Sequence, residues 1–215
     1  PLQAVHVVGY RLIGLYLKDA HSQVRVYSLK GELEREIQLP GLGTASGFGG
    51  EMDSSETFFA FSSFTAPATI YHCDVSTGET DVFRKPKMLF KSEDYETRQV
   101  FYTSKDGTRV PMFISHKKGM QLDGQNATYL YGYGGFNHAI TPGFSPSYLV
   151  WMEMGGVVAI ANLRGGAEYG SEWHDAGRKL KKQNVFDDFI AAGEWLIKNG
   201  YTSTPKLAIG GASNG

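Results

Sequence analysis

The spacing of apolar residues changes near residue 88, and this change constrains the fold more than any other feature of the chain. Before it, short runs alternate polar and apolar residues and are separated by Gly- or Asp-containing turns. Runs of this kind predict β-strands. We expect them at 11–17, 23–28, 34–39, 57–62, 69–73 and 81–83. Residues 1–88 are therefore predicted to be all-β.

A weak repeat runs through this β region. Tyr27 and Tyr71 lie 44 residues apart, and each precedes a turn containing Gly-Glu. One four-stranded propeller blade takes about 40–50 residues, but two copies do not close a propeller, which needs about 4–8 blades. A β-sandwich explains the strands almost as well. The glycine-rich stretch 41–50 lacks the lysine of a phosphate-binding loop, so we interpret it as a connection between blades.

From residue 89 onward, strands alternate with helices. Strands are expected at 99–103, 110–115, 127–131, 156–161 and 206–209, and helices at 145–154, 172–183 and 187–198. The helix at 172–183 is basic and is predicted to be exposed. Asp187 and Asp188 would begin the last helix and cap it. This alternation predicts a mainly parallel α/β sheet over residues 89–215.

The strand expected at 206–209 runs into Gly211-Ala212-Ser213-Asn214-Gly215. Gly-x-Ser-x-Gly after a buried strand is the pattern of a nucleophile elbow, in which a tight turn presents the serine hydroxyl to a base. Small neighbours are needed because a side chain would clash in such a turn. A glycine-rich loop that matches by chance is the alternative, and the preceding strand favours the elbow.

A second glycine-rich segment, residues 131–137 (YGYGGFN), follows another expected strand. Acyl transfer places negative charge on a carbonyl oxygen, and hydrogen-bond donors aimed at that oxygen accelerate the reaction. The backbone N–H of Asn214 would be one donor, and a tyrosine hydroxyl of this segment could be the other. On the residues alone, however, the better reading is that Tyr131 and Tyr133 are ordinary strand aromatics.

Composition excludes several classes of function. The net charge is −1, with 21 basic and 22 acidic residues, so neither nucleic acid nor an anionic membrane is an expected partner. Cys73 is the single cysteine and cannot form an intrachain disulfide, and no Cys/His spacing predicts a metal site or cofactor. No apolar run is long enough to span a membrane, and no signal peptide is visible. We expect a cytoplasmic protein.

Four segments together resemble the prolyl oligopeptidase family, a family of serine peptidases. They are residues 130–137 (LYGYGGFN), 162–170 (NLRGGAEYG) with Trp173-His174, 184–189 (NVFDDF) and the elbow itself, with Ala212 where Gly is usual. The resemblance runs over essentially the whole chain. It implies that residues 1–88 are the last blades of a seven-bladed β-propeller. It also implies that residues 89–215 are the first part of an α/β-hydrolase domain.

The resemblance also implies an activity, cleavage of short peptides after proline through an acyl-enzyme, by a monomer. Ser213 would be the nucleophile, the Tyr133 hydroxyl and the Asn214 N–H the oxyanion donors, and Phe136 a wall of the proline pocket. In this fold the triad follows the order Ser, Asp, His, and all six histidines precede Ser213. We therefore expect the Asp and His after Gly215 and this chain alone to be inactive. His174 is assigned a structural hydrogen bond.

Two other functions remain open at the level of sequence. One is a related oligopeptidase or acylaminoacyl-peptidase that prefers a different residue before the cleaved bond. The other is a non-catalytic binding protein in which the propeller is the interaction surface.

Overall fold

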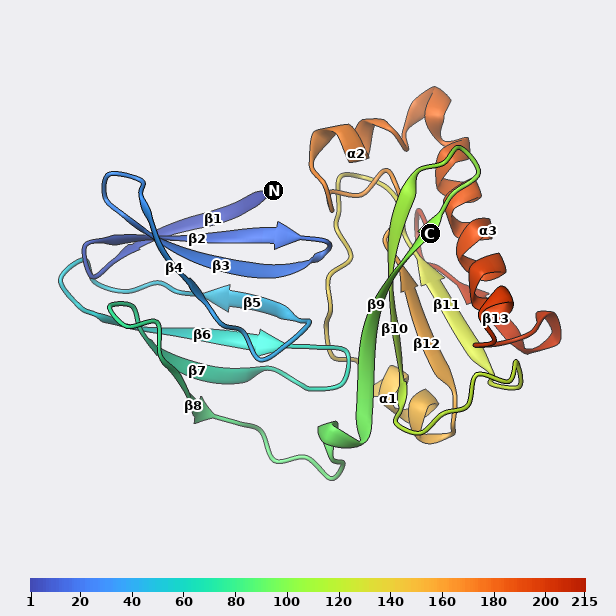
Figure 1. Cartoon of the computed structure of the whole chain (residues 1–215), viewed down its shortest axis with the longest axis horizontal. Coiled ribbons are helices and arrows are strands. Elements are labelled where there is room, and N and C mark those ends of the chain that lie inside the picture. Colours follow the sequence, from blue (N-terminus) through green and yellow to red (C-terminus); the bar gives the residue numbers. More distant parts are fainter. The chain divides into compact units, whose positions relative to one another are not determined.

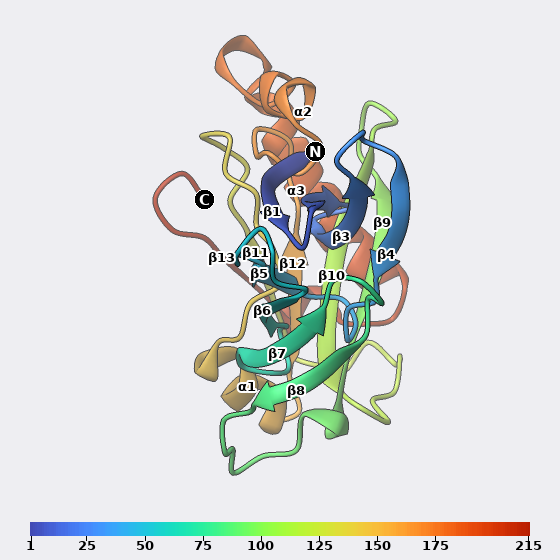
Figure 2. The same cartoon turned by 90° about the vertical axis from the view of Figure 1, so that its left-hand side faces the viewer.

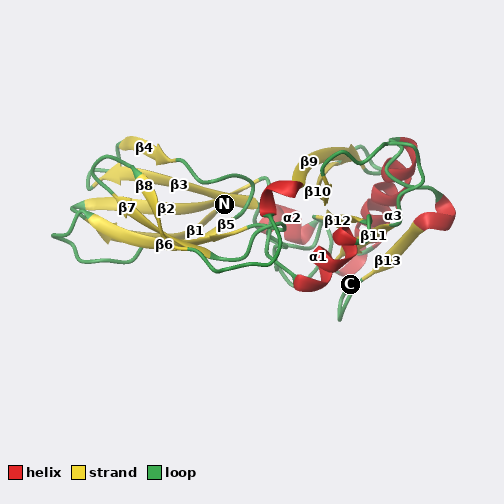
Figure 3. Ribbon diagram, turned by 90° about the horizontal axis from the view of Figure 1, so that it is seen from below, coloured by secondary structure: helices red, strands yellow, loops and turns green.

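A computed structural model describes residues 1–215, which form two compact units. The first contains Pro1–Phe90 with Thr141–Phe144, and the second contains Lys91–Ile140 with Ser145–Gly215 (Figure 1). All α-helices belong to the second unit, as the colouring by secondary structure shows (Figure 3).

The first unit consists of two four-stranded antiparallel sheets whose strands follow chain order (Figure 2). The first sheet contains β1 (Leu2–Val8), β2 (Arg11–Lys18), β3 (His21–Ser28) and β4 (Leu33–Ile37). The second contains β5 (Thr44–Gly47), β6 (Glu56–Ser62), β7 (Thr69–Asp74) and β8 (Thr80–Arg84). Tyr27 and Tyr71 lie on β3 and β7, the third strand of each sheet. The repeat in the sequence therefore corresponds to one four-stranded sheet.

The alternating strands of this unit bury one face in a common core. Its members are Val8, Ile13, Leu15, Val24, Val26 and Ile37 from the first sheet with Ala45, Phe48, Phe59, Phe61, Cys73 and Val75 from the second. The rings of Phe48 and Phe59 stack with centroids 4.6 Å apart. Burial raises the pKa of the Cys73 thiol to about 11, so this cysteine is an inert core residue.

Two strands of the first unit are missing from the sequence prediction. The edge strand β1 exposes about half of the Leu2 and Val5 side chains, so its pattern of apolar residues does not match its burial. The strand β5 lies inside the glycine-rich stretch 41–50, which was interpreted as a connection alone. Gly47 is required there because a Cβ would lie 2.9 Å from the Phe58 carbonyl oxygen, and its φ is +110°.

The second unit carries a five-stranded sheet in the order β13-β11-β12-β10-β9. Its strands are β9 (Tyr95–Thr103), β10 (Arg109–Lys117), β11 (Thr128–Gly132), β12 (Val157–Ala161) and β13 (Leu207–Gly210). Strands β11, β12 and β13 run parallel, and the hairpin of β9 and β10 joins β12 in antiparallel orientation. All five residues of β12 are buried, as predicted for a strand covered on both faces.

Three α-helices accompany this sheet. They are α1 (Pro146–Glu153), α2 (Ser171–Asp175) and α3 (Gln183–Lys198), and short 3-10 turns cover Ser92–Asp94, Lys179–Lys181 and Thr204–Lys206. The helix expected at 145–154 is confirmed as α1. The apolar face of α3 packs on the sheet through Val185, Ala192 and Leu196.

The prediction of one basic helix at 172–183 is wrong. The helix α2 ends at Asp175 because Gly177 packs against backbone, where a Cβ would lie 2.3 Å from the Gly165 nitrogen. Lys179 then adopts a left-handed φ of +53°. The next helix, α3, already begins at Gln183. Asp187 and Asp188 are therefore inside α3, and their interpretation as caps is also wrong.

Candidate active site

The two glycine-rich segments leave the same edge of the sheet. Strands β11 and β13 are parallel neighbours, with Tyr131 paired to Gly210. The segment after β11 begins with Tyr133, and the segment after β13 contains Ser213. The topology thus brings together two candidate regions that are about 80 residues apart in sequence.

Ser213 lies in a tight turn with strained backbone. Its φ is +55°, in the left-handed region that non-glycine residues avoid, at a cost of about 1–3 kcal/mol. The flanking glycines are sterically required: a Cβ on Gly211 would lie 2.2 Å from the carbonyl carbon of Gly215, and one on Gly215 would lie 2.3 Å from the Gly132 oxygen. This geometry presents the serine side chain at the end of β13, as a nucleophile elbow does.

The segment after β11 is equally constrained. Gly134 has a φ of +58°, and a Cβ there would lie 2.4 Å from Val185. Phe136 and Asn137 are consecutive left-handed residues, both with φ of +53°. As a result the Phe136 ring points outward and is 78% exposed. An exposed aromatic ring held by strained backbone suits a binding surface better than a core.

Polar contacts join the two segments. The Asn214 side-chain amide donates to the carbonyl oxygen of Tyr133. The Lys182 ammonium donates to Asn214 Oδ1 and to the Gly134 carbonyl oxygen, each at 2.9 Å. Sequence reasoning missed Lys182 because it lies next to three other basic residues between 178 and 181, in a segment that is predicted to be an exposed helix.

Two hydrogen-bond donors at this edge have no acceptor within the chain, the Tyr133 hydroxyl and the backbone N–H of Asn214. Both residues line a cavity of about 280 Å³ together with glycines 132, 211 and 215. A second cavity of about 440 Å³ lies against Phe136, His174 and Asn214. Free donors beside a presented serine can stabilise negative charge that develops on a bound carbonyl oxygen.

His174 contacts backbone atoms. Its Nδ1 lies 2.7 Å from the Gly165 carbonyl oxygen and 3.1 Å from the Asn137 nitrogen. A protonated Nδ1 donates to Gly165, and an unprotonated Nδ1 accepts from the Asn137 N–H. In either tautomer His174 forms a hydrogen bond to backbone next to the left-handed residues 136 and 137. The predicted structural hydrogen bond of His174 is therefore confirmed.

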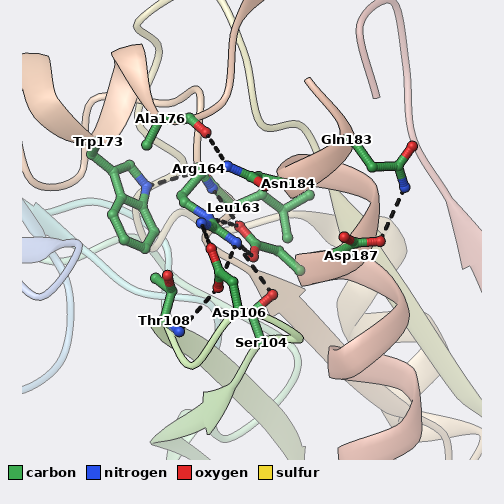
Figure 4. A network of polar contacts seen from close by, with 11 residues as sticks. Ser104, Asp106, Thr108, Leu163, Arg164, Trp173, Ala176, Gln183, Asn184 and Asp187 are labelled. Atoms are coloured by element: carbon green, nitrogen blue, oxygen red, sulfur yellow. Dashed lines mark hydrogen bonds and ion pairs between the residues drawn. The ribbon is translucent and has the colours of Figure 1, made fainter. Parts of the chain in front are cut away.

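A buried ion-pair network is centred on Arg164, in the loop after β12 (Figure 4). The Arg164 guanidinium, which is 4% exposed, donates to the fully buried Asp188 at 2.6 and 2.9 Å and to Asp106 at 2.5 Å. Burial opposes the charge of Arg164, but the two carboxylates keep its pKa above the usual value. Hydrogen bonds from Arg164 in turn lower the pKa of Asp106. Asp188 therefore joins α3 to the loop after β12.

Glu168 is a second buried acid near the site. It is 1% exposed, and its Oε1 accepts hydrogen bonds from the Ile140 N–H at 3.0 Å and from the Asn162 amide at 3.3 Å. Its other oxygen has no partner. Burial raises the pKa of this carboxyl to about 7 despite those hydrogen bonds. No sequence pattern marked Glu168, since only the fold buries it.

The structure contains no cluster of three or more His, Cys, Asp or Glu side chains placed to hold a metal ion. None of its helices combines the length and the apolar character that a membrane crossing requires.

Comparison with known families matches both parts of the chain. The sequence model described as "Prolyl oligopeptidase, N-terminal beta-propeller domain" matches residues 1–86, and that of the "Prolyl oligopeptidase family" matches residues 142–215.

Curated relatives agree with these matches. A prolyl endopeptidase of Elizabethkingia meningoseptica is 52% identical over the whole chain, which covers 30% of that protein. A prolyl endopeptidase of Dictyostelium discoideum is 45% identical over 93% of the chain and 27% of its own length. The chain thus spans about 30% of the length of the relatives it matches.

Solved structures share the fold. A structure from a study of two prolyl endopeptidases superposes with a TM-score of 0.93 at 52% identity and covers 100% of this chain and 32% of its own. Prolyl oligopeptidase B from Galerina marginata, bound to a 35mer hydrolysis and macrocyclization substrate, superposes with a TM-score of 0.92 at 37% identity. That match covers 100% of this chain and 31% of the other.

Proposed function

Because this chain belongs to the prolyl oligopeptidase family, with a propeller portion followed by the start of the hydrolase domain, we propose that it is part of a serine peptidase that cleaves short peptides after proline. Residues 1–88 would be the last blades of a seven-bladed propeller. Residues 89–215 would be the first part of the catalytic domain. The observation that carries the proposal is Ser213 in left-handed backbone beside two free hydrogen-bond donors.

Ser213 is the proposed nucleophile. Its Oγ bonds to the carbonyl carbon of the scissile peptide while its proton passes to a base. The carbon–nitrogen bond then breaks, and the departing amine takes that proton. Water next attacks the ester, the bond to Ser213 breaks, and Oγ regains a proton. The strained turn holds Oγ at the exposed end of β13 through both steps, first as the attacking hydroxyl oxygen and then as the ester oxygen.

The Tyr133 hydroxyl and the Asn214 N–H are the proposed oxyanion donors. Both residues line the cavity at the end of β11 and β13, and neither donor has to break an existing hydrogen bond to reach a substrate oxygen. Preorganised donors of this kind contribute about 10²–10³-fold each to the rate.

Phe136 is the proposed contact for the substrate proline. Its ring is exposed and lines the cavity next to Asn214. A flat aromatic face suits the apolar pyrrolidine ring. The strained backbone at 136 and 137, tied to His174, would fix the ring's position.

The base and its orienting carboxylate are proposed to follow Gly215 in the whole protein. His174 is not a candidate for the base. An orienting carboxylate would bind its Nδ1, and this atom already contacts the backbone oxygen of Gly165. Asp188 is occupied by Arg164. Residues 1–215 alone should therefore show no peptidase activity. We further propose a monomeric, cytoplasmic enzyme without cofactor, in keeping with a single buried thiol and a balanced charge.

The test uses the full-length protein and fluorogenic peptides with Pro, Ala or Arg before the scissile bond. Turnover should be greatest for Pro and should disappear in Ser213→Ala, while the control Ser46→Ala, at an exposed site on β5, keeps it. Preference for Ala or Arg would favour a related oligopeptidase with another specificity. No turnover of any peptide would favour a non-catalytic binding protein.

A further inference from the structure

We propose that Lys182 is a positioning residue that holds the two oxyanion donors in one fixed geometry. The proposal rests on the function assigned above to Tyr133 and Asn214. Lys182 touches neither the nucleophile nor the Tyr133 hydroxyl in the contacts described. It acts through the two backbone segments that carry the donors, and we call this arrangement the lysine clamp, formed by Lys182, Gly134 and Asn214.

The clamp closes a small ring of hydrogen bonds. Lys182 Nζ donates to the Gly134 carbonyl oxygen and to Asn214 Oδ1, both at 2.9 Å. The opposite end of the Asn214 amide donates to the carbonyl oxygen of Tyr133. The residue after the nucleophile is thus tied at both ends of its side chain to the segment that carries the other donor.

Gly135 leaves the space that the clamp needs. A Cβ at this position would lie 2.5 Å from Asn214 Nδ2 and 2.6 Å from its Cγ, closer than real side chains approach. The Asn214 amide therefore packs flat on the glycine segment. Sterics set its plane, and Lys182 sets its orientation by recognising the oxygen end.

The position of Lys182 is fixed by a rigid element. It directly precedes α3, whose Val185 packs against Gly134 and whose Asp188 is locked to Arg164. The ammonium also lies 5.9 Å from the centre of the Phe186 ring. Partial burial lowers the pKa of Lys182, and an ammonium in such surroundings forms stronger hydrogen bonds than one in water.

A clamp of this kind affects the transition state more than substrate binding. The donors bond strongly only once the carbonyl oxygen becomes negative, so loosening them lowers kcat and leaves KM nearly unchanged. Since each donor is worth about 10²–10³-fold, loss of the clamp should cost about 10–100-fold in kcat.

The experiment compares Lys182→Met with Lys181→Met in the full-length protein. Both changes remove an ammonium, but Lys181 is exposed and makes no contact with the clamp. Three readouts are taken: kcat and KM on a proline peptide, inhibition by a peptide aldehyde ending in prolinal, and the rate of labelling by a fluorophosphonate. The aldehyde and the fluorophosphonate each place an oxygen where the oxyanion forms. K182M should lower kcat, the affinity for the aldehyde and the rate of labelling by about the same factor. Its KM should stay within about threefold of the wild-type value.

Asn214→Ala supplies a second, independent reading, including the case in which K182M does not fold. It removes the clamped side chain but keeps the backbone N–H. Alone it should lower kcat by about 10–100-fold, as expected for loss of the clamp. Where K182M folds, the double variant should lose little more than either single one, because both changes open the same ring. Additive losses would overturn the proposal.

Other outcomes separate the clamp from the proposed function. If wild type cleaves proline peptides and K182M has the same kcat as K181M, the proposed role of Lys182 is wrong and the proposed peptidase function is retained. If wild type ignores proline peptides but reacts with fluorophosphonate, the specificity is wrong and the labelling rates still decide the clamp. A fall in thermal stability with unchanged kcat would make Lys182 merely structural. No labelling of wild type would overturn both proposals.

Discussion

Glu168 gives the fold a dependence on pH that can be calculated. Its carboxyl is buried, accepts the Ile140 N–H, and has a pKa raised by burial from 4.5 to about 7. Protonation is therefore favoured in the folded state. The corresponding stability is fully present below about pH 4.5 and is lost as the pH rises through 7.

The magnitude follows from the shift in pKa. Each pKa unit corresponds to about 1.4 kcal/mol, so the complete effect is about 3 kcal/mol, of which about 2.5 kcal/mol falls between pH 5 and pH 8. Glu168→Gln stays neutral at every pH and keeps an oxygen that can accept from Ile140. It should gain that 2.5 kcal/mol over wild type across this range.

Hydrogen exchange of the Ile140 amide in the full-length protein measures the effect locally. Protection is expressed relative to the intrinsic rate at each pH, because intrinsic exchange itself accelerates with pH. The ratio of protection in E168Q to that in wild type should rise by about 70-fold from pH 5 to pH 8. Glu172→Gln, an exposed acid four residues away, should leave the ratio flat. A flat ratio for E168Q as well would refute the reasoning.

Three further predictions concern the site and its support. Tyr133→Phe should lower kcat on proline peptides by about 10²–10³-fold with little change in KM, because it removes one oxyanion donor; an unchanged kcat would exclude that role. Phe136→Ala should reduce kcat/KM for proline peptides by about tenfold, and equal losses for Ala peptides would argue against a proline contact. Asp188→Asn should cost about 3–5 kcal/mol in urea unfolding because Arg164 stays buried without its main partner. Asp187→Asn, whose carboxylate contacts only the exposed Gln183, should cost little.

The local sequence pattern was sufficient to predict elements in which burial repeats regularly from residue to residue. The alternating strands of the first unit and the apolar run of β12 are examples, since burial on one or both faces dictates their residue types. The sequence also predicted a mainly parallel sheet, but only the structure shows that β11 and β13 are neighbours in it, which brings Tyr133 and Ser213 to one edge. The roles of Ser213, Tyr133, Asn214 and Phe136 stay predictions.

Features that depend on distant partners could not be predicted. The helix expected at 172–183 breaks because Gly177 packs on Gly165, a contact that no local propensity encodes. Asp188 looked like a cap until the fold placed Arg164 beside it. Lys182 and Glu168 are ordinary surface residue types by composition, and only tertiary structure gives them partners at the site.

The central claim is that Ser213 is the nucleophile of a proline-directed peptidase. The most direct test treats the full-length protein with a peptidyl phosphonate that carries proline before the phosphorus and maps the adduct by mass spectrometry. The adduct should lie on Ser213, should be absent in Ser213→Ala, and should form faster than with the matched alanine phosphonate. An adduct on another residue, or equal rates for proline and alanine, would contradict the account.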